Sequence, residues 1–207
     1  LAKCLNCESD TKPTSVPCNK CSNTIEITAG RSVDFLEIDA ASNTQVEKIR
    51  DLIETVEYKP AKGRYKIFLI DEVHMLSTAS FNALLKTLEE PPPHVVFIFA
   101  TTNPEKIPKT VQSRCLQLNL KTVNEKILNN HLNQILKKEK IKHDDESTQL
   151  ISKSANGSVR DALTILDQAI AHGNGELKSN EVKKLLGTID DSLLFELLEG
   201  IVDGDGK

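Results

Sequence analysis

Short apolar runs alternate with longer periodic segments along the first 120 residues of the chain. Three runs predict strands, and the last two are apolar enough to be buried on both faces, as in a parallel sheet. They are residues 34–39, 67–70 and 95–100. Between them, apolar residues recur at helical spacing from Ser42 to Val56, and again from Ser77 until prolines end the pattern at 91–93. The stretch Cys115–Leu120 alternates apolar and polar positions, which predicts a last, more exposed strand.

Only helical spacing is found after Lys121, and it predicts four helices. The apolar positions that define them are Ile127, Leu132, Ile135 and Leu136, then Leu150, Ile151 and Ala155, then Leu163, Leu166 and Ile170, and finally Val182, Leu185 and Leu186. Strands alternating with helices, and then helices alone, predict an α/β domain with a parallel sheet at 1–121 and a small all-α domain at 122–187. A final amphipathic segment, Asp190–Val202, indicates that a further helical domain begins at 188–207.

Composition places the chain among ordinary globular proteins, with 39% apolar and 27% charged residues in a length of 207. The net charge of −4 argues against non-specific binding of nucleic acid over the whole surface. The sequence has no run of about 20 apolar residues, which a membrane span needs, and no signal peptide opens it. We therefore expect a cytoplasmic protein with no membrane partner. Because the residues from Leu1 are typical of the end of a helix, we also expect a fragment that begins inside a domain.

Four cysteines near the start form two C-x2-C pairs, Cys4 with Cys7 and Cys18 with Cys21. In a chain without a secretion signal this spacing indicates metal ligation rather than disulfides, and four thiolates suit a closed structural zinc site. The alternative is a set of cysteines that bind no metal. A stand-alone zinc module for DNA has little support, because the segment has few basic residues. We expect a zinc-binding insertion at 4–21.

Two adjacent carboxylates, Asp71 and Glu72, follow the apolar run at 67–70. In parallel α/β sheets, ligands bind beyond the carboxyl ends of the strands. Nucleotide hydrolysis uses two carboxylates at such a place, one to hold Mg²⁺ at the β- and γ-phosphates and one to polarise the attacking water. The alternative is that the pair only caps the next helix or solvates the end of a strand.

Three further features favour a nucleotide site. The next buried run ends in Thr101 and Thr102, whose hydroxyl groups would lie near a phosphate or the attacking water if the two strands are neighbours, although such residues also open ordinary turns. Arg114 could stabilise transition-state charge in a neighbouring subunit, or form only a surface ion pair. Arg160 falls in the first turn of a predicted helix, where the dipole disfavours a cation, so it is suited to bind an anion.

In order and spacing, these segments resemble the tau/gamma clamp-loader ATPase family of bacterial DNA polymerase III, which is of the AAA+ type. The resemblance covers nearly the whole chain, and the block at 64–115 is specific to this family within AAA+ proteins. The residues that carry it are "LNC", "PCNKC", "EIDAASNTQVEKIRDLIE", "GRYKIFLIDEVHMLSTASFNALLKTLEEPPPHVVFIFATTNPEKIP", "SRC" and "GSVRDALTILDQAI".

The resemblance implies an AAA+ sheet truncated at its N-terminus, a helical lid and the start of an oligomerisation collar at 188–207. Carried over residue by residue, it also implies Walker B carboxylates, a first nucleotide sensor, a trans-acting arginine finger and a second sensor. These are, in the same order, Asp71 with Glu72, Thr102 with Thr101, Arg114, and Arg160. The implied cofactors are ATP and Mg²⁺.

The function that the resemblance implies is an ATPase subunit of a five-subunit loader in the DNA-directed DNA polymerase III holoenzyme. Such a loader opens the sliding clamp and places it on primed DNA, and its C-terminal parts reach the polymerase core. Two rival functions are a non-catalytic scaffold subunit of the same loader and a DExH helicase motor. The intact acid pair disfavours the scaffold, and "ATTN" followed by "SRC" fits the loader better than the helicase.

The chain departs from the family in two places. The phosphate-binding loop, Gly-rich and ending Gly-Lys-Ser/Thr, is absent from these 207 residues, so we expect this fragment alone to be inactive. The family also has one cysteine followed, after a gap, by three at x2 spacing, and the last of those positions is Thr24 here. We expect Cys4 to take the vacant position beside Cys7, because residues three apart on a helix share a face.

Overall fold

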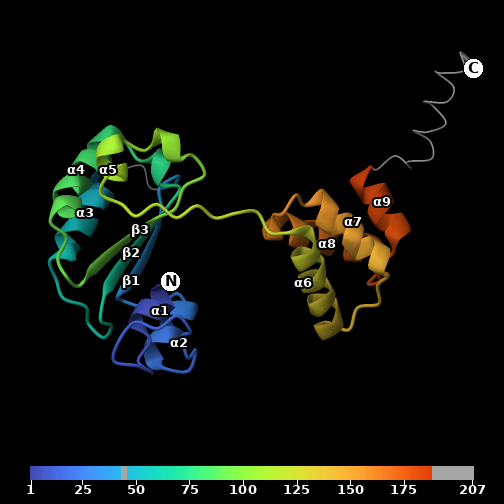
Figure 1. Cartoon of the computed structure of the whole chain (residues 1–207). Coiled ribbons are helices and arrows are strands. Elements are labelled where there is room, and N and C mark those ends of the chain that lie inside the picture. The colour runs from blue at the N-terminus through green and yellow to red at the C-terminus, as the bar shows by residue number, and fades with distance from the viewer. Residues whose placement is uncertain (43–45, 188–207) are drawn as a thin grey trace, which may run out of the picture. The chain divides into compact units, whose positions relative to one another are not determined.

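The computed structural model describes residues 1–42 and 46–187 (Figure 1). The chain divides into two compact units, Leu1–Leu118 and Asn119–Lys207. The expected helix at Asp190–Val202, and the collar domain that it would begin, lie outside the described residues. No helix in the described ranges is long and apolar enough to cross a membrane.

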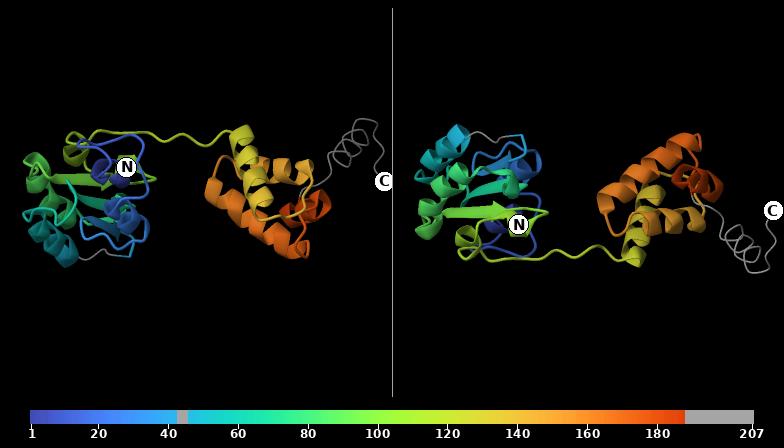
Figure 2. Two further views of the ribbon diagram at one scale, coloured as in Figure 1. Left: turned by 90° about the horizontal axis from the view of Figure 1, so that it is seen from below. Right: turned by 90° about the horizontal axis from the view of Figure 1, so that it is seen from above.

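A three-stranded parallel sheet lies at the centre of the first unit (Figures 1 and 2). Its strands, in spatial order, are β1 (Phe35–Asp39), β2 (Lys66–Asp71) and β3 (Val95–Phe99). The register pairs Asp39 with Asp71 and Ile70 with Phe99. The three strands predicted at 34–39, 67–70 and 95–100 and their parallel arrangement are therefore confirmed, and the central place of β2 explains why its run is so apolar.

Helices cover both faces of this sheet. They are α1 (Ala2–Asn6), α2 (Ser22–Thr28), α3 (Val46–Val56), α4 (Thr78–Glu89) and α5 (Lys109–Gln112), with the short 3-10 helices η1 (Val73–Met75) and η2 (Pro104–Lys106). On one face, Ile70 packs in a cluster with Ile49 of α3 and Leu84 of α4. On the other, Ile67 packs with Ile27 of α2. Because successive strand residues point to opposite faces, β2 serves both layers.

The segment that carries the first four cysteines is tied to the start of β2. The side-chain amide of Asn6 donates to the carbonyl oxygen of Tyr65 at 2.8 Å, and its Oδ1 accepts from the Tyr65 N–H at 2.9 Å. Asp34, just before β1, accepts three backbone N–H groups from residues 61–63 at 2.7 to 2.8 Å. Burial by itself would raise the pKa of Asp34, but these N–H groups outweigh it and hold the pKa below its ordinary value.

The strand expected at Cys115–Leu120 is not formed. From Leu116 the chain runs without regular structure, and Leu116, Leu118 and Leu120 are 86%, 70% and 96% exposed. A strand needs a neighbour to pair its backbone N–H and C=O groups, and no described strand lies beside this segment. Alternation alone is therefore not sufficient to specify a strand here.

The described part of the second unit is built from helices, as the sequence pattern predicts. They are α6 (Glu125–Lys138), α7 (Asp145–Ser154), α8 (Val159–His172) and α9 (Ser179–Leu186). Leu132 of α6, Ile151 of α7, Leu166 of α8 and Val182 of α9 share one buried core. Gly157, between α7 and α8, has a φ of 81°, and a Cβ there would lie 2.8 Å from the Val123 carbonyl oxygen. That close approach requires glycine.

Candidate active site

The carboxylate pair stands where β2 ends. Asp71 is the last residue of the strand and is exposed, and its Oδ1 accepts the N–H of Glu72 at 2.9 Å. Glu72 has φ 46° and ψ 43°, a left-handed conformation that few non-glycine residues adopt. The chain then turns so that the N–H of Val73 donates to the carbonyl oxygen of Ala100, just past β3, at 3.0 Å. The two strand ends are thereby joined at one edge of the sheet.

One side chain from just past the end of β3 reaches the Glu72 carboxylate. The hydroxyl of Thr102 donates to Glu72 Oε2 at 3.2 Å, and His74 Nδ1 lies 3.2 Å from the same oxygen. His74 Nδ1 is also 2.9 Å from Thr101 Oγ1, which accepts the N–H of Asn103 at 3.0 Å. The structure therefore brings Glu72 and the two threonines into one hydrogen-bonded group, as expected if β2 and β3 are neighbours.

Arg114 follows α5 in the first unit and is held by two contacts. Its Nη2 forms an ion pair with Glu89 Oε1 at 2.6 Å, and its Nη1 donates to the carbonyl oxygen of Thr110 at 2.6 Å. Arg160 is exposed in the first turn of α8, two residues after the N-cap residue Ser158, and belongs to the second unit. Within the first unit, Arg114 has no contact with the carboxylate pair among the interactions of the described residues.

Three of the four expected metal ligands come together. The sulfur atoms of Cys7, Cys18 and Cys21 all lie within 4.8 Å of one another. Backbone N–H groups point at them: that of Cys18 donates to Cys7 Sγ at 3.3 Å, and that of Cys21 to Cys18 Sγ at 3.3 Å. Thr24 is buried beside them, with its Oγ1 3.2 Å from Cys21 Sγ. The arrangement offers three thiolates and one hydroxyl.

Cys4 lies outside this group, which differs from the expected ligand set. Its thiol is 3.8 Å from the carbonyl oxygen of Ser15. The reason is the end of α1, because Asn6 is its last residue and Cys7 already has an extended backbone with φ −65° and ψ 129°. The two cysteines therefore do not share a helix face, although their spacing of three would place them together on a longer helix.

Hydrogen bonds to the sulfur atoms lower the pKa values of two thiols in this cluster. The N–H of Cys18, followed by contacts with Ser9, lowers the pKa of Cys7 to about 6. Burial would raise the pKa of Cys21, but the N–H of Glu8 and the contacts with Thr24 outweigh it, so the net shift is downward. Donors that stabilise a thiolate favour the form that binds metal.

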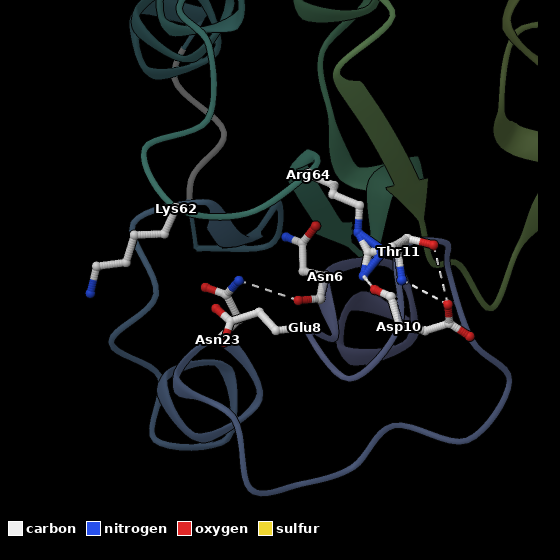
Figure 3. Close-up of a pocket in the computed structure, with 7 residues that line it drawn as sticks. All are labelled: Asn6, Glu8, Asp10, Thr11, Asn23, Lys62 and Arg64. Carbon is white, nitrogen blue, oxygen red and sulfur yellow. Dashed lines mark hydrogen bonds between the residues drawn. The ribbon is translucent and has the colours of Figure 1, made fainter.

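A small polar pocket surrounds the start of β2, at the end of the strand away from the carboxylates (Figure 3). Within it the Arg64 guanidinium donates to the carbonyl oxygens of Cys7 and Asp10. The residues that line it are Asn6, Glu8, Asp10, Thr11, Asn23, Lys62 and Arg64. Arg64 therefore holds the backbone of the cysteine segment against the start of the sheet. The pocket is separate from the candidate active site.

Two residues of these sites are not among the predicted ones. His74 has only one sequence signal, its place two residues after Glu72 in "DEVH". Thr24 has a signal in the C-x2-C-x2-T spacing, but a threonine at a ligand position predicts the loss of a ligand and not a contact with the cluster. Both belong to their sites through three-dimensional contacts that spacing alone does not show.

Two family models match this sequence. One, described as "DNA polymerase III, delta subunit", matches residues 1–124, and the other, "DNA polymerase III clamp loader subunit, ATPase lid domain", matches residues 127–175. The chain belongs to the DNA polymerase III clamp-loader subunit family. The lid match covers most of α6–α8, so these three helices of the clamp-loader chain belong to an ATPase lid domain.

Similar proteins agree with membership of the clamp-loader family. The chain is 54% identical over all its 207 residues to DNA polymerase III subunit tau of Salmonella typhimurium, and 53% identical to the subunit tau of Escherichia coli. It is 46% identical to DNA polymerase III subunit gamma of Buchnera aphidicola subsp. Baizongia pistaciae. It spans 32% of the length of both tau proteins and 55% of that gamma protein.

The fold of this clamp-loader chain is similar to that of a solved AAA+ structure. The Thermotoga maritima RuvB Holliday junction branch migration motor matches with a TM-score of 0.61 and 16% sequence identity. The match covers 78% of this chain and 54% of that one. The chain therefore has the AAA+ arrangement of a parallel sheet with helices, followed by a lid.

Proposed function

We propose that this chain is the ATP-hydrolysing part of a clamp-loader subunit, in which Asp71 holds Mg²⁺ and Glu72 polarises the attacking water. One observation carries the proposal: the Glu72 carboxylate, at the carboxyl end of β2, accepts a hydrogen bond from Thr102 across the strands. Glu72 is the N-cap residue of η1, yet its side chain makes no capping hydrogen bond. A carboxylate whose purpose was to cap the next helix would make one.

The residues present fit a magnesium nucleotide. Asp71 is an exposed oxygen ligand at the edge where parallel sheets bind ligands, and hard oxygen donors suit Mg²⁺. Bound Mg²⁺ would neutralise charge on the β- and γ-phosphates. Thr102 orients the Glu72 carboxylate, and Thr101 and Thr102 respond to the terminal phosphate. Arg160 binds nucleotide within its own subunit.

Arg114 acts across a subunit boundary on the nucleotide of its neighbour. About a third of the Arg114 side chain is exposed, and two of its guanidinium nitrogens are held by contacts. Both features support this role. The assembly that we infer is a cytoplasmic ring of five loader subunits that opens the sliding clamp and places it on primed DNA. Further parts of the full-length protein bind the polymerase core. The support for these partners is membership of the clamp-loader family.

We further propose that Cys7, Cys18 and Cys21 hold Zn²⁺ in a structural site. The mutual distances of their sulfur atoms and the N–H groups directed at them fit tetrahedral thiolate coordination. When bound, the ion would cross-link the loop at 8–20 to the ends of α1 and α2. Substitutions of Cys4 and Thr24, with measurement of bound zinc, test which residue completes the site.

The central test uses Glu72→Gln in the full-length protein, assembled with its partner subunits. Glutamine keeps an oxygen that accepts from Thr102 but cannot polarise water as a carboxylate does. Hydrolysis of ATP should fall by a factor of about 100 to 10,000, while ATP binding stays close to that of the wild type. Steady-state turnover and equilibrium binding of ATP are measured on the same assemblies.

The matched control is Glu57→Gln, which removes the same charge at an exposed position just after α3 and should leave turnover unchanged. Near-normal turnover in Glu72→Gln would contradict the proposal and favour a non-catalytic scaffold subunit. A loss of ATP binding equal to the loss of turnover would place Glu72 in binding instead of hydrolysis.

A further inference from the structure

His74 connects the two strand ends that form the candidate active site. It lies in η1, two residues after Glu72, and its side chain is only 8% exposed. Its Nδ1 is 3.2 Å from Glu72 Oε2 and 2.9 Å from Thr101 Oγ1. A single ring nitrogen thus contacts both the carboxylate that follows β2 and a hydroxyl that follows β3.

The contacts decide which ring nitrogen carries a proton. A carboxylate oxygen only accepts hydrogen bonds, so Nδ1 approaches Glu72 Oε2 favourably only as N–H. Thr101 Oγ1 has two lone pairs, and the N–H of Asn103 uses one of them at 3.0 Å. The second can accept from His74 Nδ1, which lies 2.9 Å away. We therefore assign the proton to Nδ1, shared between the carboxylate and the hydroxyl.

We propose that His74 is a positioning residue that fixes the Glu72 carboxylate relative to the threonine pair of β3. The inference rests on the proposed role of Glu72. The backbone of Glu72 is left-handed, so its side-chain direction is not set by regular structure and depends on what holds its carboxylate. Thr102 and His74 both hold Oε2. Displacing a reacting group by about 1 Å costs on the order of 100-fold in rate, so loss of one holder should affect hydrolysis.

His74 also links Thr101 to the Glu72 carboxylate. Thr101 contacts His74, His74 contacts Glu72, and Glu72 contacts Thr102, so a chain of three contacts joins the residues that follow β2 to those that follow β3. A phosphate that draws either hydroxyl away would change the donors around Glu72. His74 therefore makes the orientation of the carboxylate depend on both threonines, not on Thr102 alone.

The test compares His74→Asn with His74→Gln and His74→Leu in the full-length protein within its assembled loader. The asparagine amide nitrogen can occupy the place of Nδ1, whereas the glutamine amide reaches toward the place of Nε2 and leucine fills the space without a donor. We expect His74→Leu and His74→Gln to lower kcat about tenfold or more with KM for ATP within about twofold, and His74→Asn to keep most of kcat. Thermal melting of each variant reports its folding.

Normal kcat in His74→Leu would overturn the inference, and so would equal losses in His74→Asn and His74→Leu. If His74→Leu fails to fold, His74→Gln against His74→Asn tests the same contact, since only asparagine places a donor where Nδ1 lies. Glutamine must then lower kcat more than asparagine. A normal Glu72→Gln enzyme would refute the proposed function itself. A defective Glu72→Gln with a normal His74→Leu would refute only the role of His74.

Discussion

Arg114 combines a weak structural role with a strong proposed chemical one. Its ion pair with Glu89 is partly exposed, and such pairs contribute at most about 1 kcal/mol to folding stability. Charge stabilisation by an arginine from a neighbouring subunit contributes far more, about 1,000-fold or more in hydrolysis. The two roles therefore predict very different consequences for the same substitution.

Arg114→Ala should leave the melting temperature of the isolated protein nearly unchanged and reduce DNA-stimulated ATP hydrolysis of the assembled loader by about 1,000-fold. Arg50→Ala, at an exposed position of α3, is the control and should change neither. Mixed assemblies with Glu72→Gln subunits should show activity that depends on ring order. Unchanged hydrolysis in Arg114→Ala would exclude the trans-acting role.

The residues most readily predicted are those at strand ends. Asp71 and Thr102 follow apolar runs, and adjacency of two parallel strands is enough to place them at one edge. His74 could not be predicted in the same way, because its contact with Thr101 spans 27 positions and depends on the turn at Glu72. Contacts of this kind depend on backbone geometry that local sequence patterns do not contain.

At the scale of elements, the length of α1 decides which cysteines meet. The helix ends at Asn6, so Cys7 turns toward Cys18 while Cys4 stays on the helix beside Ser15. Thr24, on α2, lies beside the cluster, with its Oγ1 3.2 Å from Cys21 Sγ. A neutral hydroxyl is a poor zinc ligand, so a bound ion should keep an exchangeable fourth position.

Metal analysis should find about one zinc per wild-type chain, retained in Cys4→Ser and lost in Cys18→Ser. Thr24→Cys supplies a fourth thiolate and should slow the removal of zinc by a chelator. Loss of zinc in Cys4→Ser would instead make Cys4 a ligand, through a rearranged end of α1. A wild-type protein without zinc would show that the cysteines have no metal role.

Helices and strands could be predicted where the described residues include the strands that they pair with or the helices that they pack against. β2 is recognisable because strands on both sides and helices on both faces require an apolar run. The segment Cys115–Leu120 has an equally regular pattern, yet it pairs with no strand among the described residues and leaves Leu116, Leu118 and Leu120 exposed. The short helix α2 has no strong periodicity of its own, and its position is set by Ile27 packing on the sheet.

At the scale of the whole molecule, each unit contains an aspartate that holds several backbone N–H groups. Asp34 accepts the backbone N–H groups of residues 61–63 in the first unit, and Asp144 accepts those of Ser147 and Ser179 in the second. For Asp144, as for Asp34, burial alone would raise the pKa, but the N–H groups outweigh it and the pKa is lowered. Both carboxylates therefore stabilise the folded chain in their charged form.

A lowered folded-state pKa stabilises the protein above the unfolded value of about 3.9, and the effect is lost as the pH falls through the folded-state pKa. Asp34→Asn should therefore lower the free energy of unfolding by about 1–3 kcal/mol at pH 7, with a smaller difference below about pH 4. Denaturant titrations at several pH values measure this. Glu54→Gln, exposed on α3, is the charge-matched control. A difference that is constant with pH would contradict the mechanism.

The contact between Asn6 and Tyr65 also has a kinetic consequence. It joins positions 59 residues apart, and closing so long a loop costs chain entropy that local contacts do not. The cysteine segment should therefore dock after the transition state for folding, so Asn6→Ala should accelerate unfolding and leave the folding rate nearly unchanged. Stopped-flow measurements over a range of denaturant separate the two rates, and slower folding with unchanged unfolding would show early docking instead. With late docking, the segment is the last part of this unit to fold and the first to detach.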